Sequence, residues 1–464
     1  MAMPYHSSHA ITSPAGMNSI HEKKQPENES AHEEAQKAQV LPYSEDAFGS
    51  EEHAEIQYKI LTWWQCAIIM VAETISLGVL ALPAAVADLG LGPALSVLLG
   101  LGGLATYTGY VIGQLKWKYP HVSSAADAGQ LLMGWFGYEL LFWSNIMYLV
   151  FIMASHLLTF SVAMNTITEH AACSIVFGFV GLALSFLLAI PRTLERMSWL
   201  SFVSFASIIA AVLITMIAAG IRNPPATVHA TTDTSLVSGF TAAANIVFSF
   251  SSHNTFFTII SELREPRDFP KSLLLLQSID MTIYAVAAVV IYCYAGEDVP
   301  SPALGAAGPL ISRISYGVAL PTILIAGVIM GHIACKQIYI RVFAKTDRMH
   351  KRDLVAVGSW VAIALGVWVA AWIVASAIPV FNNLLSLIVS LFASWFSFGL
   401  PGIFWLWMNK WRWFCRSRKI FLAVLNILSV CVGVVLCGVG LYTSGKAIYN
   451  DAGSESFSCA NNAD

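Results

Sequence analysis

The chain has 464 residues, of which 56% are hydrophobic and only 11% are charged, and its mean hydropathy is +0.65. Soluble domains carry about 25% charged residues, so this composition excludes a soluble globular protein and indicates an integral membrane protein. The net charge of −3 indicates nothing about partners, and the sequence has no basic stripe that would bind nucleic acid.

The chain begins with a polar segment that lacks any apolar run. Residues 1–55 are rich in Ser, His, Glu, Gln, Asn and Lys, a composition too polar to form a packed core. We therefore expect a disordered cytoplasmic tail over residues 1–55 and no cleavable signal peptide. The transmembrane domain should cover residues 56–445, followed by a short extracytoplasmic tail at 446–464.

Hydropathy along the chain predicts an all-α integral membrane protein with about 11 membrane-spanning helices. Their approximate ranges are 62–87, 91–115, 138–165, 174–190, 199–221, 238–261, 273–295, 311–343, 354–376, 380–407 and 420–442. The count depends on two places, because the fourth span is short and the ninth and tenth spans are separated by only a few residues.

The basic residues predict the orientation of these spans. With the amino terminus inside, all but three of the 25 lysines and arginines fall on the cytoplasmic side, as the positive-inside rule requires. The three outside are Arg222, Arg313 and Lys446. We expect a multi-pass protein of the plasma membrane with a cytoplasmic amino terminus, and the vacuolar membrane is the alternative.

The first predicted span carries a carboxylate near its middle. Glu73 lies within Trp63–Ala87, and an ionisable side chain at that depth costs at least about 2.5–3.5 kcal/mol. Ser76, Gly78 and Pro83 follow, and these residue types allow a membrane helix to break. A broken helix is tolerated only where its freed backbone faces protein or a water-filled cavity. We therefore expect Glu73 to border a polar cavity inside the membrane, which indicates transport.

The sixth predicted span is also interrupted near its middle. The polar residues there are Ser249, Ser251, Ser252, His253 and Asn254. A matched pair of interrupted helices is typical of the binding site of secondary transporters. The alternative is that these serines bond back to their own helix and merely bend it.

An odd number of spans suits two inverted five-helix repeats and one additional helix. The first repeat would cover about 62–221 and the second about 238–407, so that broken helices 1 and 6 occupy corresponding positions. The additional helix would cover about 420–442.

Several segments resemble one known family. Glu73–Gly90 (ETISLGVLALPAAVADLG) is similar to the first-helix signature of the amino acid/auxin permease family, and Phe248–Leu273 is similar to its sixth helix and following loop. Ile325–His350 and Ile378–Leu406 resemble helices 8 and 10 of its fungal neutral amino acid permeases. The resemblance covers about residues 55–445. It implies the eleven-helix fold of the amino acid–polyamine–organocation superfamily and uptake of α-amino acids by alternating access.

The two predicted breaks suit an amino acid zwitterion. A break around Ile75–Gly78 would expose backbone N–H groups at the positive end of a half-helix, which suits a carboxylate. The half-helix ending near Phe250–Ser252 would offer free carbonyls to the ammonium group. The predicted substrate-binding residues are therefore Thr74, Ile75, Ser76, Leu77, Gly78, Phe250, Ser251 and Ser252. Phe250 and its phenylalanine-rich surroundings favour a neutral substrate with a large apolar or aromatic side chain.

The coupling ion is predicted to be a proton. In the sodium-linked members that this family resembles, an Asn in helix 1 and a hydroxyl in helix 8 help to hold the ion. Here Ala72 stands at the first position, and residues 323–331 have no hydroxyl. Glu73 and His253 can each bind a proton at accessible pH, so one of them is the expected carrier. A permanent ion pair or hydrogen bond is the alternative for each.

The other membrane histidines and the cysteines are interpreted as structural. His156 and His332 are expected to be packing residues or polar groups that hold helices together. The eight cysteines lie mostly in apolar segments and have no CxxC spacing, so we interpret them as small buried residues, and not as metal ligands or disulfides.

Other classes of function have less support in the sequence. It has no HExxH, GxSxG or metal-ligand cluster, so neither an enzyme nor a cofactor beyond the coupling ion is expected. The pore loop of a channel is not evident. A nutrient sensor of the same fold would signal through its tail, which has no obvious domain. A sodium-coupled or vacuolar transporter is the closer alternative. The expected partners are the amino acid and membrane lipid, and the oligomeric state is not predicted.

Overall fold

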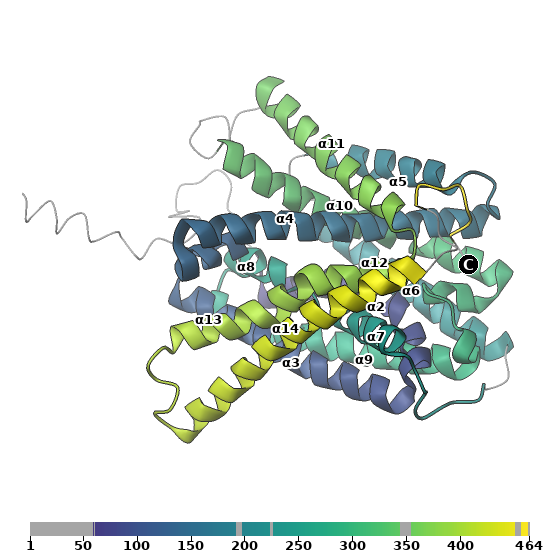
Figure 1. The fold of residues 1–464 in the computed structure, drawn as a ribbon. Coiled ribbons are helices and arrows are strands. Elements are labelled where there is room, and N and C mark those ends of the chain that lie inside the picture. Colours follow the sequence, from purple (N-terminus) through teal and green to yellow (C-terminus); the bar gives the residue numbers. More distant parts are fainter. Residues whose placement is uncertain are drawn as a thin grey trace, which may run out of the picture. The chain divides into compact units, whose positions relative to one another are not determined.

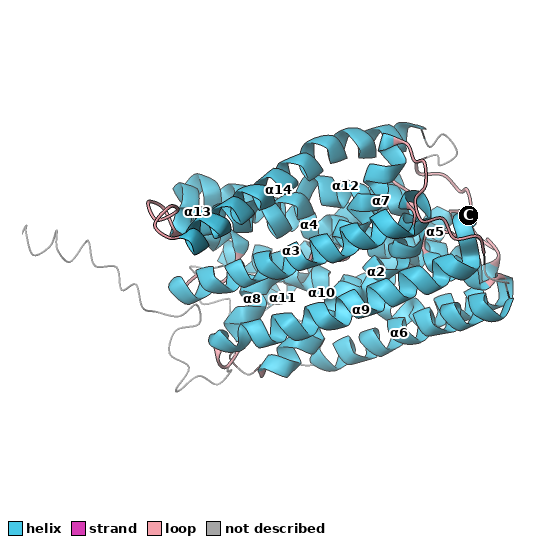
Figure 2. Ribbon diagram, turned by 90° about the horizontal axis from the view of Figure 1, so that it is seen from below, coloured by secondary structure: helices cyan, strands magenta, loops and turns pink. Residues whose placement is uncertain are grey.

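The structure is a computed structural model that describes residue 59 and residues 61–191, 197–222, 226–343, 354–450 and 456–462. The polar tail predicted over residues 1–55 lies outside these residues. Within them, the regular elements are helices, apart from one isolated bridge between Leu61 and Leu263 (Figures 1 and 2). The prediction of an all-α membrane protein is confirmed.

In the described residues, 9 stretches of helix are long and apolar enough to cross a membrane. They are formed by α2 (Trp63–Leu89), α3 (Leu91–Lys118), α4 (Ala125–Thr168), α6 (Met197–Arg222), α9 (Phe269–Ala295), α10 (Pro309–Phe343), α11 (Leu354–Ala377), the series α12 (Phe381–Ile388), η6 (Val389–Gly399) and α13 (Leu400–Met408), and α14 (Ser417–Asn450). The shorter helix α5 (Ser174–Ala189) and the pair α7 (Leu236–Phe248) and α8 (His253–Glu262) occupy the other predicted spans. Short 3₁₀ turns lie at η2 (Pro266–Asp268), η3 (Gly296–Asp298) and η4 (Ala303–Ala307).

The first membrane helix, α2, is continuous from Trp63 to Leu89, so the predicted break in helix 1 is wrong. The helix also passes through Pro83 without interruption. Gly78 serves close packing instead, since a Cβ there would lie 2.8 Å from the Cα of Ser249. The small residues of this span therefore bring α2 against another segment of the chain and do not interrupt it.

The sixth predicted span does break, as the sequence predicts. α7 ends at Phe248 and α8 begins at His253, and residues 249–252 form a link between the two half-helices. Within this link the Ser251 hydroxyl donates to the carbonyl of Phe248 at 2.6 Å. Such a side-chain bond gives the backbone an alternative to a helical partner, so it stabilises the end of α7.

The helices around this link come from both halves of the chain. α2 packs against α7 and α9, and α4 packs against α10. Helices at corresponding positions in the two predicted repeats are in contact, namely α2 with α7, α3 with α9, α4 with α10 and α5 with α11. The division into two inverted repeats itself stays a prediction.

Candidate functional site

A small central cavity lies beside the link between α7 and α8. Its volume is about 40 Å³, and its walls come from α2, α4, α10 and both half-helices. The lining residues are Glu73, Thr74, Ser76, Leu77, Ile152, His156, Phe248, Ser251, Ser252, Asn254 and Met330. The cavity therefore places a carboxylate, several hydroxyls and an amide beside an apolar wall.

The structure brings together most of the residues predicted to bind substrate. Thr74, Ser76 and Leu77 reach the cavity from α2, and Ser251 and Ser252 reach it from the link. The two segments come from different predicted repeats. Their meeting at one cavity follows the sequence prediction, although α2 contributes side chains from an intact helix and not a broken one.

The other predicted substrate contacts lie outside the cavity lining. Ile75 is fully buried among core residues, and Gly78 packs against the link. The Phe250 ring lies edge-on to Tyr284, with 5.4 Å between ring centroids. It also lies 3.0 Å from the position that a Cβ on Gly102 would take. Phe250 therefore fills the space between the link, α3 and α9, and this position does not support a contact with substrate.

Two tyrosines bind the carbonyl groups at the link. Tyr284 on α9 donates its hydroxyl to the carbonyls of Ser249, at 2.9 Å, and Thr74, at 3.0 Å. Tyr148 on α4 donates to the Ser251 carbonyl at 2.7 Å. The sequence predicts free carbonyls in the link, but those of Ser249 and Ser251 each accept a hydrogen bond from a tyrosine hydroxyl. Both tyrosines were missed, because nothing in the chain near them marks these distant partners.

Glu73 reaches the cavity with half of its carboxylate unpaired, so the expectation that it borders a polar cavity is confirmed. Its Oε2 lies 3.4 Å from the hydroxyl oxygen of Thr255 on α8. Its Oε1 is buried and has no hydrogen-bond partner in the described part of the chain. A carboxylate oxygen with open lone pairs can accept a proton or the N–H groups of an ammonium.

Both histidines near the link form hydrogen bonds to neighbouring helices. The imidazole of His253 is directed toward α3, with Nε2 2.9 Å from the Ala105 carbonyl and 3.1 Å from the Thr108 hydroxyl. This position favours a structural hydrogen bond for His253 over a role as proton carrier. The Nδ1 of His156 lies 3.0 Å from the Ile323 carbonyl of α10, which agrees with its interpretation as a polar group between helices, and His156 also lines the cavity, which was not predicted.

A row of side-chain amides leads away from the cavity. Asn254 on α8 donates to the Oδ1 of Asn145 on α4 at 3.3 Å. Asn145 in turn donates to the Oε1 of Gln337 on α10 at 3.0 Å. Asn145 and Gln337 were missed by the sequence analysis. The sequence does contain a signal for these two residues, because side-chain amides are uncommon inside apolar spans and tend to form hydrogen bonds between helices.

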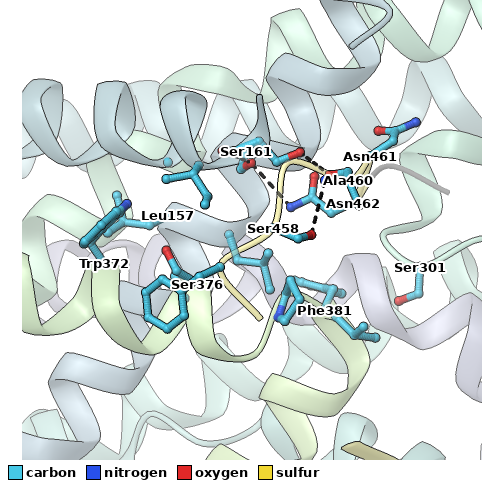
Figure 3. A pocket seen from close by; sticks show the side chains of 18 residues that line it. Leu157, Ser161, Ser301, Trp372, Ser376, Phe381, Ser458, Ala460, Asn461 and Asn462 are labelled. Atoms are coloured by element: carbon cyan, nitrogen blue, oxygen red, sulfur yellow. Dashed lines mark hydrogen bonds between the residues drawn. The ribbon is translucent and has the colours of Figure 1, made fainter. Parts of the chain in front are cut away.

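A second pocket, of about 380 Å³, lies farther along α4 (Figure 3), and we call it the outer pocket to distinguish it from the central cavity. One of its walls is the carboxyl-terminal strap, which we define as residues 456–462. Its labelled lining residues are Leu157, Ser161, Ser301, Trp372, Ser376, Phe381, Ser458, Ala460, Asn461 and Asn462. The lining combines hydroxyls and amides with aromatic rings and includes no charged side chain. Because Ile152 and His156 line the central cavity, one stretch of α4 contributes to both spaces.

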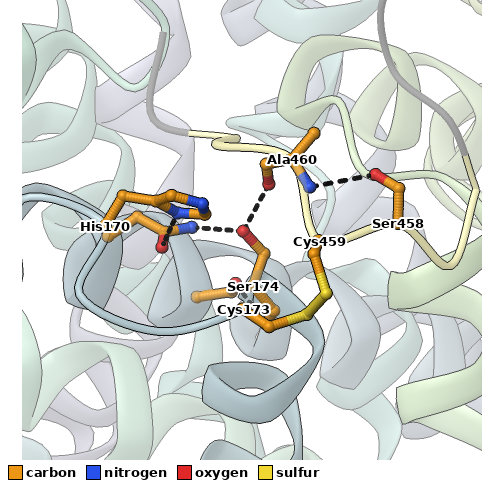
Figure 4. Close-up of a disulfide and its surroundings, with 8 residues drawn as sticks. His170, Cys173, Ser174, Ser458, Cys459 and Ala460 are labelled. Carbon is orange, nitrogen blue, oxygen red and sulfur yellow. Dashed lines mark hydrogen bonds between the residues drawn. A yellow bond between two sulfur atoms is a disulfide. The ribbon is translucent and has the colours of Figure 1, made fainter.

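A disulfide between Cys173 and Cys459 fixes the strap to the chain just before α5 (Figure 4). Beside it, the Ser174 hydroxyl donates to the carbonyl of Ala460 at 2.5 Å. The interpretation that no cysteine forms a disulfide is therefore wrong. The pairing depends on a return of the chain across 286 residues, which no local pattern reveals. Of the free cysteines, Cys66 and Cys335 are buried as expected, whereas Cys415 and Cys431 are exposed.

Comparison with known proteins gives a consistent result. Residues 59–445 match the family described as transmembrane amino acid transporter protein. The N amino acid transport system protein of Neurospora crassa is 36% identical, over 88% of this chain and 90% of the relative. Two proteins named transmembrane transporter are also similar. That of Gibberella moniliformis is 28% identical, over 91% and 95% of the two chains, and that of Fusarium pseudograminearum is 26% identical, over 88% and 89%.

Proposed function

Because this chain belongs to the transmembrane amino acid transporter family, we propose that it takes up neutral L-amino acids by proton symport through alternating access. The observation that carries this proposal is the position of Glu73. Its unpaired Oε1 lies at the central cavity, beside the link between the two half-helices. An ionisable group at membrane depth is by default a functional candidate, and this one can hold a proton or the substrate ammonium group.

The cavity lining supports a neutral substrate with an apolar side chain. Leu77, Ile152, Phe248 and Met330 form an apolar wall, and among the described residues Glu73 is the one charged side chain in the lining. A basic substrate would bring a second positive charge without a second carboxylate. An acidic substrate would place a negative charge against the apolar wall, which is costly without a partner. Large apolar or aromatic amino acids are therefore the preferred class.

Substrate binding requires the walls of the cavity to move. A volume of about 40 Å³ is close to the share of liquid volume that one water molecule takes, about 30 Å³, and is too small for an amino acid. The bonds from Tyr284 and Tyr148 hold the link against α9 and α4. Opening of the cavity would lengthen or exchange these bonds, so both tyrosines are expected to take part in alternating access.

The proton is preferred to sodium because oxygen ligands are scarce around the middle of α10. Thr322, at the edge of the stretch without hydroxyls, is buried and donates its hydroxyl to the Ser204 carbonyl. Of the two predicted proton carriers, Glu73 is favoured, since it faces the cavity while His253 bonds to α3.

The proposed orientation has the amino terminus in the cytoplasm and the carboxyl-terminal strap outside the plasma membrane. Arg313, one of the basic residues predicted to lie outside, pairs with Glu169 at the end of α4, close to Cys173. Disulfides persist in oxidising compartments, so the bond between Cys173 and Cys459 supports the same placement of this end.

Uptake by the reconstituted protein tests the proposal. Proteoliposomes receive radiolabelled leucine or phenylalanine under an imposed proton gradient or an imposed sodium gradient. We expect accumulation with the proton gradient alone, loss of this accumulation in Glu73→Gln, and retention of it in His253→Gln. Accumulation driven by sodium alone would overturn the proposed coupling. Binding of substrate without any uptake would indicate a sensor of the same fold.

A further inference from the structure

A second carboxylate lies inside the membrane domain, away from the cavity lining. Asp280 is near the middle of α9 and fully buried, and neither of its carboxylate oxygens has a hydrogen-bond partner in the described part of the chain. One turn earlier, Gln277 is also buried, and its Oε1 has no partner either. This face of α9 thus holds three acceptor oxygens for which the described residues supply no donor.

Asp280 belongs to the face of α9 that contacts α2. Ser272 donates to the carbonyl of Trp63 at 2.7 Å, and Tyr284 donates to the carbonyl of Thr74 at 3.0 Å. Residues four positions apart lie on one side of a helix, and Asp280 falls at this spacing between Ser272 and Tyr284. It therefore lies at the interface with α2, one turn from the hydroxyl that joins α2 to the link.

In the described residues, α9 and the helices that pack against it carry their lysine and arginine side chains only near their ends, away from Asp280. α9 packs against α2, α3 and α6 as well as the 3₁₀ turns at its ends. The titratable residues of α2 are Cys66, Glu73 and Asp88, and Tyr284 lies one turn from Asp280 on α9 itself. The imidazole of His253 reaches the Ala105 carbonyl of α3. On α3, the Tyr107 hydroxyl meets Asn426 of α14, and residues 200–221 of α6 include no titratable side chain.

A proton completes the bonding of this group. Protonated Asp280 would carry one O–H donor, and residues three apart on a helix are neighbours, so the O–H can be donated to the Oε1 of Gln277. A metal cation would require more ligands, since hard cations take six or more oxygens and this face offers three. The site is therefore suited to a proton.

Tyr284 can transmit a change in the protonation of Asp280 to the central cavity. Its single hydroxyl bridges the carbonyl of Thr74, next to Glu73 in the chain, and the carbonyl of Ser249 in the link. An ionised Asp280 one turn away would compete for this hydroxyl. Withdrawal of the hydroxyl would weaken the contact between α2 and the link, which must loosen if the cavity is to open.

We propose that Asp280 is a second proton-binding residue of the transport cycle and that Tyr284 couples its protonation to the opening of the central cavity. The inference rests on the proposed proton symport. It assigns to α9 a role separate from that of Glu73, because Asp280 does not line the cavity and so need not touch the substrate.

The test separates exchange from accumulation in proteoliposomes that contain the full chain. Asp280→Asn imitates the protonated carboxyl and cannot release a proton. We expect this variant to retain exchange of labelled leucine against internal leucine and to lose accumulation driven by a pH gradient. Asp88→Asn, which removes a carboxylate at the carboxyl-terminal end of α2, is the matched control and is expected to retain both activities.

Accumulation by Asp280→Asn at the wild-type level would overturn the inference, since Asp280 would then be a permanently protonated structural group. If Asp280→Asn does not fold, Tyr284→Phe provides the test. Its accumulation is expected to fall relative to exchange, and an unchanged ratio would overturn the inference. Failure of the proposed function is distinguishable, because the wild-type protein would then show no response to a proton gradient.

Discussion

Gly78 is the residue on which the contact between α2 and the link depends. Its Cα faces Ser249 so closely that a Cβ would lie 2.8 Å from the Ser249 Cα and 2.9 Å from its hydroxyl oxygen. Neither neighbour is the end of a long side chain that could turn aside. The backbone of α2 can therefore stay beside the link only if this position lacks a side chain.

Gly78→Ala is expected to force α2 and the link apart. Overpacking of this kind costs about 1–3 kcal/mol, and it also displaces Thr74 and Ser76 from the cavity. We expect a lower thermal transition temperature of the purified protein together with a loss of leucine uptake. Gly100→Ala is the matched control, since a Cβ at Gly100 would meet nothing within 4 Å. Equal behaviour of the two variants would contradict the role given to Gly78.

At the level of elements, the sequence predicted the positions of the membrane helices and the break in the sixth. It could not tell that break from the false one in helix 1. Thr74 bonds back to the Met70 carbonyl at 2.7 Å, which leaves α2 helical. The link between α7 and α8 is held by tyrosines on α4 and α9, whose contribution depends on tertiary packing. Polar and small residues occur both in the middle of α2 and at the link, so the local sequence suggests a break at each. Hydrogen-bond donors on distant helices determine that only the second of these places is interrupted.

The residues around the central cavity could likewise be predicted only in part, because side-chain directions depend on tertiary packing. A carboxylate at membrane depth is visible in the sequence, and Glu73 was predicted to border a cavity for that reason. Asp280 has the same signal in the seventh predicted span and was missed. The side toward which an imidazole points depends on helix rotation, so the sequence could not separate His156, at the cavity, from His253, at α3.

The carboxyl-terminal strap is held by the disulfide at its middle and by hydrogen bonds on both sides of it. Besides the disulfide, the Phe457 N–H donates to the Ser376 carbonyl at 2.9 Å, and Asn165 donates to the Oδ1 of Asn462 at 2.6 Å. Cys459→Ser is expected to release the strap from the outer pocket and lower stability by about 2–4 kcal/mol, the usual range for a disulfide. Thermal unfolding with and without reductant measures this change.

Two controls make the strap experiment specific. Reductant should lower the transition temperature of the wild-type protein to that of Cys459→Ser and leave the variant itself unchanged. Cys431→Ser, which removes an exposed free cysteine, should behave as wild type. A reductant effect on Cys459→Ser would mean that the bond between Cys173 and Cys459 is not what stabilises this end of the chain.

At the scale of the whole molecule, the proposed orientation in the membrane can be tested by chemical labelling of one native cysteine. Cys415 is exposed and lies in the turn between α13 and α14, a segment rich in lysine and arginine. In intact cells, a membrane-impermeant maleimide should leave Cys415 unlabelled, and permeabilisation should allow labelling. The Cys415→Ser variant measures the background labelling of the other cysteines. Labelling of Cys415 in intact cells would reverse the proposed orientation.

The shared stretch of α4 has a consequence for how substrate preference can change. Ile152 and His156 line the central cavity, while Leu157, Leu158 and Ser161 line the outer pocket, so adjacent residues of one rigid helix serve both. A substitution that shifts or rotates α4 alters both spaces at once. Such a mutation is tolerated only if both the central cavity and the outer pocket keep a working shape. Residues that line only one of the two spaces, such as Phe248 and Met330 at the central cavity or Trp372 and Phe381 at the outer pocket, are free of this double constraint and can vary one at a time.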